Sequence, residues 1–309
     1  MVKPIVIVGK GSIGQRHSDT LTVNFPDIPV VHLGAGIRSG ATPADIVAEV
    51  ISYDPRCVLV ASPAHLHAAH TLPLLAKGIP CLVEKPMALT AADADAMLQA
   101  SINNHVALQI GYNLRCRSEY QEIVSLLPLL GNIQWASFHC GQNLKQWRPN
   151  RELDQTASGV REWGGGVIWE LSHEIDLAVS MIPGLKLEHA IVTRGIFPLS
   201  VDEVAMLTLS NAHQKPVHIH LDLHAFTPNR TIRVCGTKGQ ISADFIARTV
   251  TVDFGQGPIT KEFPPENTYF SQLSSFLAHI EAGSFVSEDT QQALEVVNLV
   301  EKVYQYTSQ

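Results

Sequence analysis

Four ionisable side chains crowd into one short segment near the middle of the chain. The segment GGGVIWELSHEID, residues 164–176, carries Glu170, His173, Glu174 and Asp176. A carboxylate and a histidine three positions apart can exchange a proton, orient one another or hold a metal ion. Which of these applies depends on the direction in which the local backbone presents them.

An apolar stripe predicts one helix over residues 167–182. Its members are Ile168, Leu171, Ile175, Ala178 and Ile182. At ~100° per residue, His173 falls nearly opposite this stripe. Glu170, Asp176 and Trp169 lie on the same side as His173. Because a large aromatic on a fully exposed face is unusual, we predict that this face lines a ligand cavity.

Metal binding is a competing interpretation of the histidine-rich segments. An E-x-x-H pair serves di-iron bundles only with a second such pair, which the sequence lacks. The segment HLHAAH, residues 65–70, is explained by loop, cap and helix-surface roles. The histidines of HIHLDLH (His218, His220 and His224) share one face of a predicted strand, where they could line a wet sheet face or an interface. We therefore expect no metal site.

A glycine-rich loop follows the first apolar segment. VIVGKGSIGQRH contains Gly9, Gly11 and Gly14 in the pattern G-x-G-x-x-G, between a predicted strand and a predicted helix. Such glycines permit a tight turn and close approach of the backbone to a pyrophosphate. The helix N-terminus, at Ser12 and Ile13, then offers free N–H groups to the phosphates. The loop predicts a dinucleotide site.

The strand-like segment 28–34 bears on which dinucleotide binds. NAD requires an acidic residue about 20 positions after the glycines to bind the ribose hydroxyls. No Asp or Glu ends this segment, and Arg38 and Ser39 lie just beyond it. Arg38 could contact the 2′-phosphate of NADP, so the sequence favours NADP over NAD. Arg38 could equally be a solvated loop residue.

Hydrophobic periodicity divides the chain into two predicted domains. Over residues 1–118, short continuous apolar strands alternate with helices, which indicates a doubly wound, parallel α/β sheet. Over residues 119–309, longer and partly alternating strands joined by turns indicate an antiparallel sheet with helices. We expect an N-terminal doubly wound domain followed by a C-terminal α+β domain.

Composition excludes several classes of protein. The chain has 309 residues, is 45% hydrophobic and 17% charged, and carries a net charge of −7. This charge argues against nucleic-acid binding, no apolar run approaches the ~20 residues of a membrane span, and the N-terminus does not read as a signal peptide. The five cysteines are scattered without a C-x-x-C pair, which favours reduced thiols and a cytoplasmic protein.

Three motifs together resemble the glucose–fructose oxidoreductase/inositol dehydrogenase family of NAD(P)-dependent oxidoreductases. They are GKGSIGQRH, ASPAHLHAAH…GIPCLVEKPMALT and GGGVIWELSHEID, with GYNLRCRSEY as a weaker fourth match. They occur in the family's order over roughly residues 5–180. The resemblance implies a Rossmann domain, then an α+β domain with a large, mostly antiparallel open sheet that often forms the oligomer interface.

The resemblance also assigns site residues. Lys85 matches the lysine of the family's EKP motif in the active site, next to Glu84, and the Lys85–Pro86 bond is expected to be cis. The residues expected to line the cofactor near its nicotinamide end are Ser62, Pro63, His65 and His67. His173 matches the catalytic histidine. Where many members have an aspartate four residues before it, this chain has Trp169, and the nearest acid is Glu170.

Aromatic and cationic side chains precede the predicted helix. Arg148 and Trp163 suit a sugar or the phosphates of a nucleotide sugar, and loop ion pairs are the alternative. With Trp169, Asp176 and Asn113 of the GYN segment, they form the predicted substrate site.

The sequence predicts an NAD(P)-dependent oxidoreductase that acts on a sugar, a polyol or a nucleotide-linked sugar. His173 is the expected general base, Lys85 assists it or replaces it, and Glu170 or Asp176 orients the histidine or binds substrate hydroxyls. The alternatives are a regulatory protein that binds dinucleotide and sugar without catalysis, and an NAD-dependent glycosidase. We expect a homodimer or homotetramer formed through the second sheet.

Overall fold

The computed structural model describes residues 2–36, 40–147, 156–195, 197, 199–283, 285 and 288–308. The chain folds into two compact units. The parallel-sheet unit comprises Met1–Asn113 and Asn267–Asn298, and the large-sheet unit comprises Leu114–Glu266 and Leu299–Gln309. This grouping differs from the predicted division after residue 118, because the chain returns to the first unit after residue 266.

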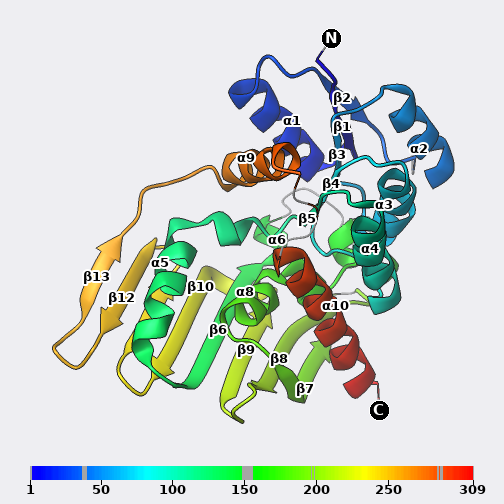
Figure 1. Cartoon of the computed structure of the whole chain (residues 1–309). Helices are drawn as coiled ribbons and strands as arrows, with labels where there is room; N and C mark the ends of the chain where they lie inside the picture. Colours follow the sequence, from blue (N-terminus) through cyan, green and yellow to red (C-terminus); the bar gives the residue numbers. More distant parts are fainter. Residues whose placement is uncertain are drawn as a thin grey trace. The chain divides into compact units, whose positions relative to one another are not determined.

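The parallel-sheet unit confirms the predicted doubly wound architecture (Figure 1). Its strands lie in the order β2-β1-β3-β4-β5, all parallel. The strands are β1 (Ile5–Val8), β2 (Val30–Leu33), β3 (Cys57–Val60), β4 (Cys81–Val83) and β5 (Leu108–Ile110). The helices between them are α1 (Ser12–Asn24), α2 (Pro43–Ser52), η1 (Ala64–Leu66) with α3 (His67–Ala76), and α4 (Ala91–Asn104). Strands β1, β3 and β4 are buried throughout, as expected for a sheet covered on both faces.

Local sequence signals explain where several helices begin. The Thr42 hydroxyl accepts a hydrogen bond from the Asp45 N–H, and the Asp45 carboxylate accepts one from the Thr42 N–H. This reciprocal capping box satisfies otherwise orphaned donors, and Pro43 suits the first helical position. Thr90 caps α4 in the same way, by accepting from the Asp93 N–H. Helices α2 and α4 therefore begin directly after the threonines that cap them.

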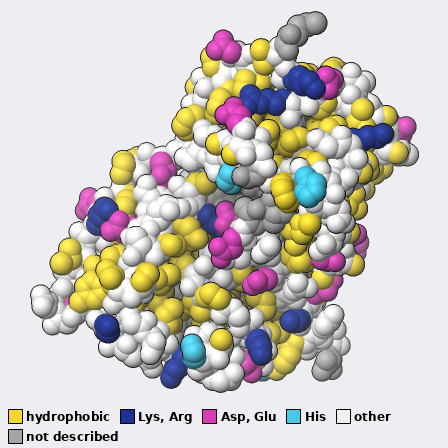
Figure 2. Space-filling model, viewed as in Figure 1, with side chains coloured by type: hydrophobic (Ala, Val, Ile, Leu, Met, Phe, Trp, Pro, Cys, Tyr) yellow, Lys and Arg dark blue, Asp and Glu magenta, His cyan; other side chains and the backbone are white. Residues whose placement is uncertain are grey.

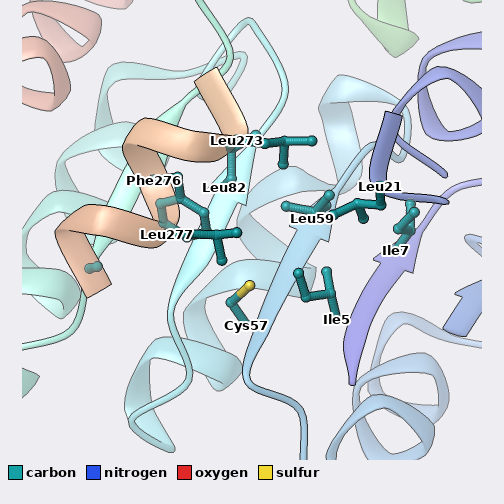
Figure 3. Close-up of a cluster of buried hydrophobic side chains, with 10 residues drawn as sticks. Ile5, Ile7, Leu21, Cys57, Leu59, Leu82, Leu273, Phe276 and Leu277 are labelled. Atoms are coloured by element: carbon teal, nitrogen blue, oxygen red, sulfur yellow. The ribbon is translucent and has the colours of Figure 1, made fainter. Parts of the chain in front are cut away.

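The late helix α9 (Thr268–Glu281) completes the core of the parallel-sheet unit. Its Leu273, Phe276 and Leu277 pack with strand residues such as Leu59 and Leu82, as Figure 3 shows. In Figure 1, α9 is drawn in orange beside α1. An amphipathic helix far along the sequence thus covers apolar surface that the first 113 residues leave open.

The large-sheet unit contains an eight-stranded sheet in the order β13-β12-β11-β10-β6-β9-β8-β7. Only the β6–β9 pair is parallel among the described ladders. The strands are β6 (Ile133–Asn143), β7 (Lys186–Arg194), β8 (Asp202–Ser210), β9 (Pro216–Asp222), β10 (His224–Gly236), β11 (Gln240–Asp244), β12 (Thr249–Asp253) and β13 (Ile259–Glu262). The mostly antiparallel sheet is confirmed; β13, exposed at every residue, is an addition to the predicted strands.

Helices cover one face of this sheet. They are η2 (Asn113–Cys116), α5 (Ser118–Leu126), η3 (Leu127–Leu130), α6 (Leu144–Trp147), η5 (Ala157–Gly159), η6 (Arg161–Trp163), α7 (Val167–Glu170) and α8 (His173–Met181). Helix α10 (Glu288–Tyr306) contributes its first part to one unit and its last part to the other. Strand residues alternate between buried positions under the helices and positions on the opposite, open face, which is the pattern of a one-sided sheet.

The prediction of one helix over residues 167–182 is wrong. The backbone breaks at Leu171 and Ser172, which separates α7 from α8. Residues 174–179 are all buried, so α8 has no polar face opposite an apolar stripe. A helical wheel assumes a straight helix with one covered side, and packing on several sides overrides that assumption.

The prediction that His224 shares a strand face with His218 and His220 is also wrong. β9 ends at Asp222, and His224 begins β10. Its Nε2 lies 2.7 Å from the carboxylate of Glu203, which is fully buried under the covered face. A chain reversal at Leu223 therefore separates histidines that a continuous strand would have aligned.

Charged side chains of both signs are mixed on one face of the described surface. On the face drawn in Figure 2, Lys and Arg side chains are interspersed with Asp and Glu and form no extended basic patch. Among the described residues, no helix combines the length and the apolar character needed to cross a membrane.

Candidate functional site

The glycine loop links β1 to α1 through three glycines with different constraints. Gly9 has φ +121°, and a Cβ there would lie 2.2 Å from the Ala61 carbonyl oxygen. A Cβ on Gly14 would lie 1.8 Å from the Gly9 carbonyl oxygen. Both positions therefore require glycine for the fold itself, because the backbone has no room to move away.

Gly11 is the exception, and its surroundings test whether a dinucleotide fits. A Cβ on Gly11 would meet nothing within 4 Å, and φ there is −77°. The fold does not require glycine at this position, so its advantage is that a ligand can approach the backbone. Gly11 is also the N-cap of α1 and makes no side-chain cap hydrogen bond. The N–H groups at Ser12 and Ile13 suit a pyrophosphate.

His32 at the end of β2 contacts the same loop. Its Nε2 lies 2.9 Å from the Gly9 carbonyl oxygen. Residues 34–36, which follow the strand, are Gly-Ala-Gly and offer no carboxylate for ribose hydroxyls. Arg38, on which the NADP expectation depends, lies outside the described residues.

The EKP segment has the predicted cis Lys85–Pro86 bond. Lys85 is half-buried directly after β4. Glu84, expected at the cofactor, is 8% exposed, and its Oε1 lies 2.7 Å from Nε2 of the fully buried His17. His17 belongs to α1, so this hydrogen bond ties the end of β4 to the helix that the glycine loop begins.

The segment after β3 brings several predicted cofactor residues together. His67 is buried, with Nδ1 2.8 Å from the Pro86 carbonyl oxygen and Nε2 2.8 Å from that of Ser62. Burial lowers the pKa of His67. His70 Nδ1 lies 3.0 Å from the Ser62 hydroxyl, and burial, followed by the charges of His67 and His65, lowers its pKa to about 4. His67 therefore links the residue Ser62, after β3, to the EKP turn, and His70 contacts the Ser62 side chain.

The remaining cofactor candidates here are Pro63, which is half-buried, and His65, which is exposed. Burial nonetheless lowers the pKa of His65. Exposure leaves His65 accessible to a ligand, whereas His67 has both ring nitrogens within hydrogen-bonding distance of carbonyl groups.

The carboxylates of the GGGVIWELSHEID segment separate into two classes. Asp176 is fully buried and accepts two hydrogen bonds from Arg115, Nε to Oδ2 at 3.0 Å and Nη2 to Oδ1 at 2.6 Å. Glu174 is 1% exposed and pairs with Nε of Arg230 on β10 at 2.7 Å. Buried charges persist when paired in this way, so both acids anchor α8 inside the large-sheet unit.

Glu170 and His173 are the two titratable residues of the segment that stay half-buried. Glu170 ends α7 and His173 begins α8, so the break between the helices sets both side chains. This partial exposure makes both side chains candidates for proton transfer with a ligand. The Trp169 ring, in contrast, is 5% exposed and packs near Tyr304, with ring centroids 6.2 Å apart.

Other predicted substrate residues have mixed surroundings. Asn113 is 9% exposed and donates from Nδ2 to the Thr268 hydroxyl at 3.0 Å, within the parallel-sheet unit. Trp163 is half-buried in the large-sheet unit. Arg148 lies outside the described residues. The substrate roles of all these residues stay predictions.

Asp202 and Tyr304 position α7 and have no motif in the sequence. Asp202 is fully buried, accepts from the Ile168 N–H at 3.0 Å and accepts from the Tyr304 hydroxyl at 2.9 Å. A Cβ on Gly166, where φ is +108°, would lie 2.6 Å from Asp202 Oδ1. Burial, with the Asp202 charge beside it, raises the pKa of Tyr304. The Arg161 guanidinium stacks 4.8 Å from the Tyr304 ring centroid.

The only sequence signal for Asp202 and Tyr304 is the glycine run at residues 164–166. Gly166 carries no Cβ, which makes room for the Asp202 carboxylate, but no sequence pattern says which acid fills that room. Asp202 and Tyr304 lie 36 and 138 positions beyond Gly166 in the chain, so only folding brings them to α7.

Comparisons with known proteins agree with this architecture. Residues 3–112 match the oxidoreductase family with an NAD-binding Rossmann fold. The rhizopine catabolism protein MocA of Rhizobium meliloti is 29% identical over 184 residues, covering 55% of this chain and 54% of that protein. Glucose-6-phosphate 3-dehydrogenase of Bacillus subtilis (strain 168) is 28% identical over 179 residues, covering 53% and 51%. The matched region thus spans about half the length of these relatives.

A solved structure extends the likeness in fold to the whole chain. Levoglucosan dehydrogenase, in complex with NADH and L-sorbose, has a TM-score of 0.81 and 17% sequence identity, covering 100% of this chain and 97% of that one. At this identity the match establishes the fold. The glycine loop and the EKP segment both lie within residues 3–112, so this part of the chain matches oxidoreductases with an NAD-binding Rossmann fold.

Proposed function

We propose that this protein is an NAD(P)-dependent oxidoreductase that oxidises or reduces a hydroxyl-bearing carbon of a sugar, a polyol or a nucleotide-linked sugar. The observation that carries the proposal is the open space at Gly11, at the start of α1, beside two glycines that the fold itself requires. The match of residues 3–112 to an oxidoreductase family supports the reaction. Relatives named as sugar dehydrogenases support the substrate class.

The cofactor is NAD or NADP, and we favour NADP. β2 leads into Gly-Ala-Gly, so this stretch lacks the carboxylate that binds ribose hydroxyls in NAD-specific sites. The N–H groups at the start of α1 bind the pyrophosphate. A bound nicotinamide supplies the carbon that exchanges a hydride with the substrate. Titration of intrinsic fluorescence with NADPH and NADH measures the preference directly.

In this proposal, His173 moves the substrate's hydroxyl proton and Lys85 assists it. Both side chains are half-buried, which combines partial shielding from water with access for a ligand. Lys85 is held by its neighbours: Glu84 is tied to His17, and the Pro86 carbonyl faces His67. Glu170, at the end of α7, orients His173 or binds a substrate hydroxyl in place of the aspartate that many family members have.

The partner proposed for the large sheet is a second copy of this chain. The open face of that sheet carries exposed apolar side chains on neighbouring strands, with Ile191 54% and Met206 52% exposed. Exposed apolar surface of this kind favours association. The cysteines of the described chain are all free thiols, which supports a reducing, cytoplasmic location.

The central experiment identifies the copurifying dinucleotide and then follows nicotinamide absorbance with a panel of sugars, polyols and nucleotide sugars. With an active substrate, Lys85→Met and His173→Ala should each lower kcat/KM by ~10²–10⁴, the usual contribution of acid–base catalysis. Matched controls are Lys77→Met and His213→Ala, which replace exposed residues and should leave turnover unchanged.

Circular dichroism and thermal melting check that each variant is folded. If Lys85→Met and His173→Ala both retain turnover within a few fold, the catalytic assignment is wrong. A tightly bound dinucleotide that no substrate in the panel oxidises or reduces indicates the regulatory alternative. Release of a glycosidic leaving group without net reduction of the dinucleotide indicates the glycosidase alternative.

A further inference from the structure

Two histidines and one aspartate converge on the open face of the large sheet. His139 on β6 and His220 on β9 have ring centroids 4.4 Å apart. Both direct Nε2 toward the same carboxylate oxygen, Oδ2 of Asp222, at 3.9 Å from His139 and 3.2 Å from His220. One ligand atom from each residue lies within 4.8 Å of the others.

The strand register builds this arrangement. β6 and β9 are parallel, with His139 opposite His220 and Gly141 opposite Asp222. A Cβ on Gly141 would lie 2.6 Å from Asp222 Oδ2. The missing side chain therefore gives the carboxylate room to lean over β6 toward both imidazoles.

A backbone hydrogen bond also orients the Asp222 carboxylate. Asp222 Oδ1 accepts a hydrogen bond from the His224 N–H at 2.9 Å, which leaves Oδ2 directed at the histidines. The side chains are 42%, 33% and 14% exposed for His139, His220 and Asp222. The group is thus partly shielded, oriented by backbone, and open to solvent on one side. Oriented ligands of this kind characterise protein metal sites.

We propose that His139, His220 and Asp222 bind a divalent transition-metal ion, with Zn²⁺ as the best match. Zn²⁺ binds imidazole nitrogen and carboxylate oxygen at about 2.0–2.2 Å, which places tetrahedral ligand atoms roughly 3.3 Å apart. The separations from Asp222 Oδ2, 3.2 Å to His220 and 3.9 Å to His139, lie near this value, and all three ligand atoms lie within 4.8 Å of one another. Two imidazoles with one carboxylate favour such ions over Mg²⁺ or Ca²⁺, which prefer all-oxygen sites.

The site is separate from the proposed redox chemistry and does not depend on it. His139 and His220 line a groove of about 610 Å³ on the open face, bordered by polar residues such as Ser137 and Thr208. With three protein ligands, a further coordination position remains for water or for a side chain of the second copy that we propose to pack on this face. The expectation from sequence that the chain has no metal site is thus replaced by a specific candidate.

Metal-free protein titrated with Zn²⁺ in a calorimeter, and with Co²⁺ by visible absorption, tests the proposal. Wild type should bind one equivalent and melt at a higher temperature with Zn²⁺. His220→Ala and Asp222→Asn should each weaken binding at least about tenfold. The matched control is His218→Ala, an exposed histidine on the same strand and face with a 3.4 Å contact to Thr208; it should bind like wild type.

Melting without metal shows whether each variant is folded, and Asp222→Asn keeps a side-chain oxygen for the His224 N–H. The proposal is overturned if wild type shows no saturable binding, or if His220→Ala and Asp222→Asn bind as wild type does. It is equally overturned if His218→Ala loses as much affinity as His220→Ala. Because none of these measurements involves a dinucleotide or turnover, failure here is distinguishable from failure of the proposed function.

Discussion

The two units prepare their functional groups by different physical means. In the parallel-sheet unit, the proposed dinucleotide site is made mainly of backbone: Gly9 and Gly14 shape the loop, and a Cβ on Gly11 would meet nothing within 4 Å. In the large-sheet unit, α7 and α8 are held by side chains, through Asp176 with Arg115 and Asp202 with Tyr304. A site formed by backbone groups tolerates few residue types, but a short stretch of sequence encodes it. A site held by side chains depends on partners from elements far apart in the sequence.

The largest expected effect comes from Gly9→Val. The substitution forces a β-branched residue to φ +121° with its Cβ 2.2 Å from the Ala61 carbonyl oxygen. Strain and overpacking together should lower the free energy of unfolding by about 4 kcal/mol or more, and dinucleotide binding should be lost. Urea unfolding and fluorescence titration measure the two effects. A variant with wild-type stability would show that the loop is not constrained by its backbone.

The next largest effect is expected from Asp176→Ala. It leaves the Arg115 guanidinium buried without its bidentate carboxylate, which should cost about 3–5 kcal/mol of unfolding free energy. The double variant Arg115→Met/Asp176→Leu should recover much of this loss, because both charges are then removed. As a control, Lys3→Met breaks the exposed pair with Asp54 and should cost at most about 1 kcal/mol. Equal losses for the buried and exposed pairs would contradict the assignment of Asp176 as an anchor.

Gly11→Ala separates binding from folding. A Cβ there meets nothing within 4 Å, and the backbone is extended, so stability should stay within about 0.5 kcal/mol of wild type. Dinucleotide affinity should fall roughly tenfold, equivalent to ~1.4 kcal/mol, because the methyl group occupies space at the pyrophosphate. Unchanged affinity, measured by fluorescence titration, would remove the main support for the cofactor site.

The variant with the smallest expected effect tests how α7 is positioned. Tyr304→Phe removes the hydrogen bond to Asp202 but leaves the ring beside Trp169 and Arg161. The expected loss is about 1 kcal/mol of unfolding free energy, with a fall in kcat larger than any change in dinucleotide affinity. Tyr306→Phe, which removes a more exposed hydroxyl bonded to His189, is the matched control and should change neither. If the two variants behave alike, Asp202 does not depend on Tyr304.

Much of the parallel-sheet unit was predictable, because its signals are local. Alternating apolar strands and helices, the G-x-G-x-x-G spacing and the cis Lys85–Pro86 bond all follow from short motifs and their resemblance to a family. The helix over residues 167–182 was not predictable in the same way. Its wheel placed Asp176 beside His173 on a cavity face, whereas Asp176 is buried against Arg115.

By itself, the sequence determined the two fold types and the glycine loop, since each depends on residue types at short, fixed spacings. The tertiary structure alone decided which acids of GGGVIWELSHEID are anchors and which stay accessible, because Arg115 and Arg230 reach Asp176 and Glu174 from distant elements. It alone brought His139 beside His220, through the parallel register of β6 and β9. Strand pairing is decided by packing between segments far apart in the sequence, so no local pattern predicts it.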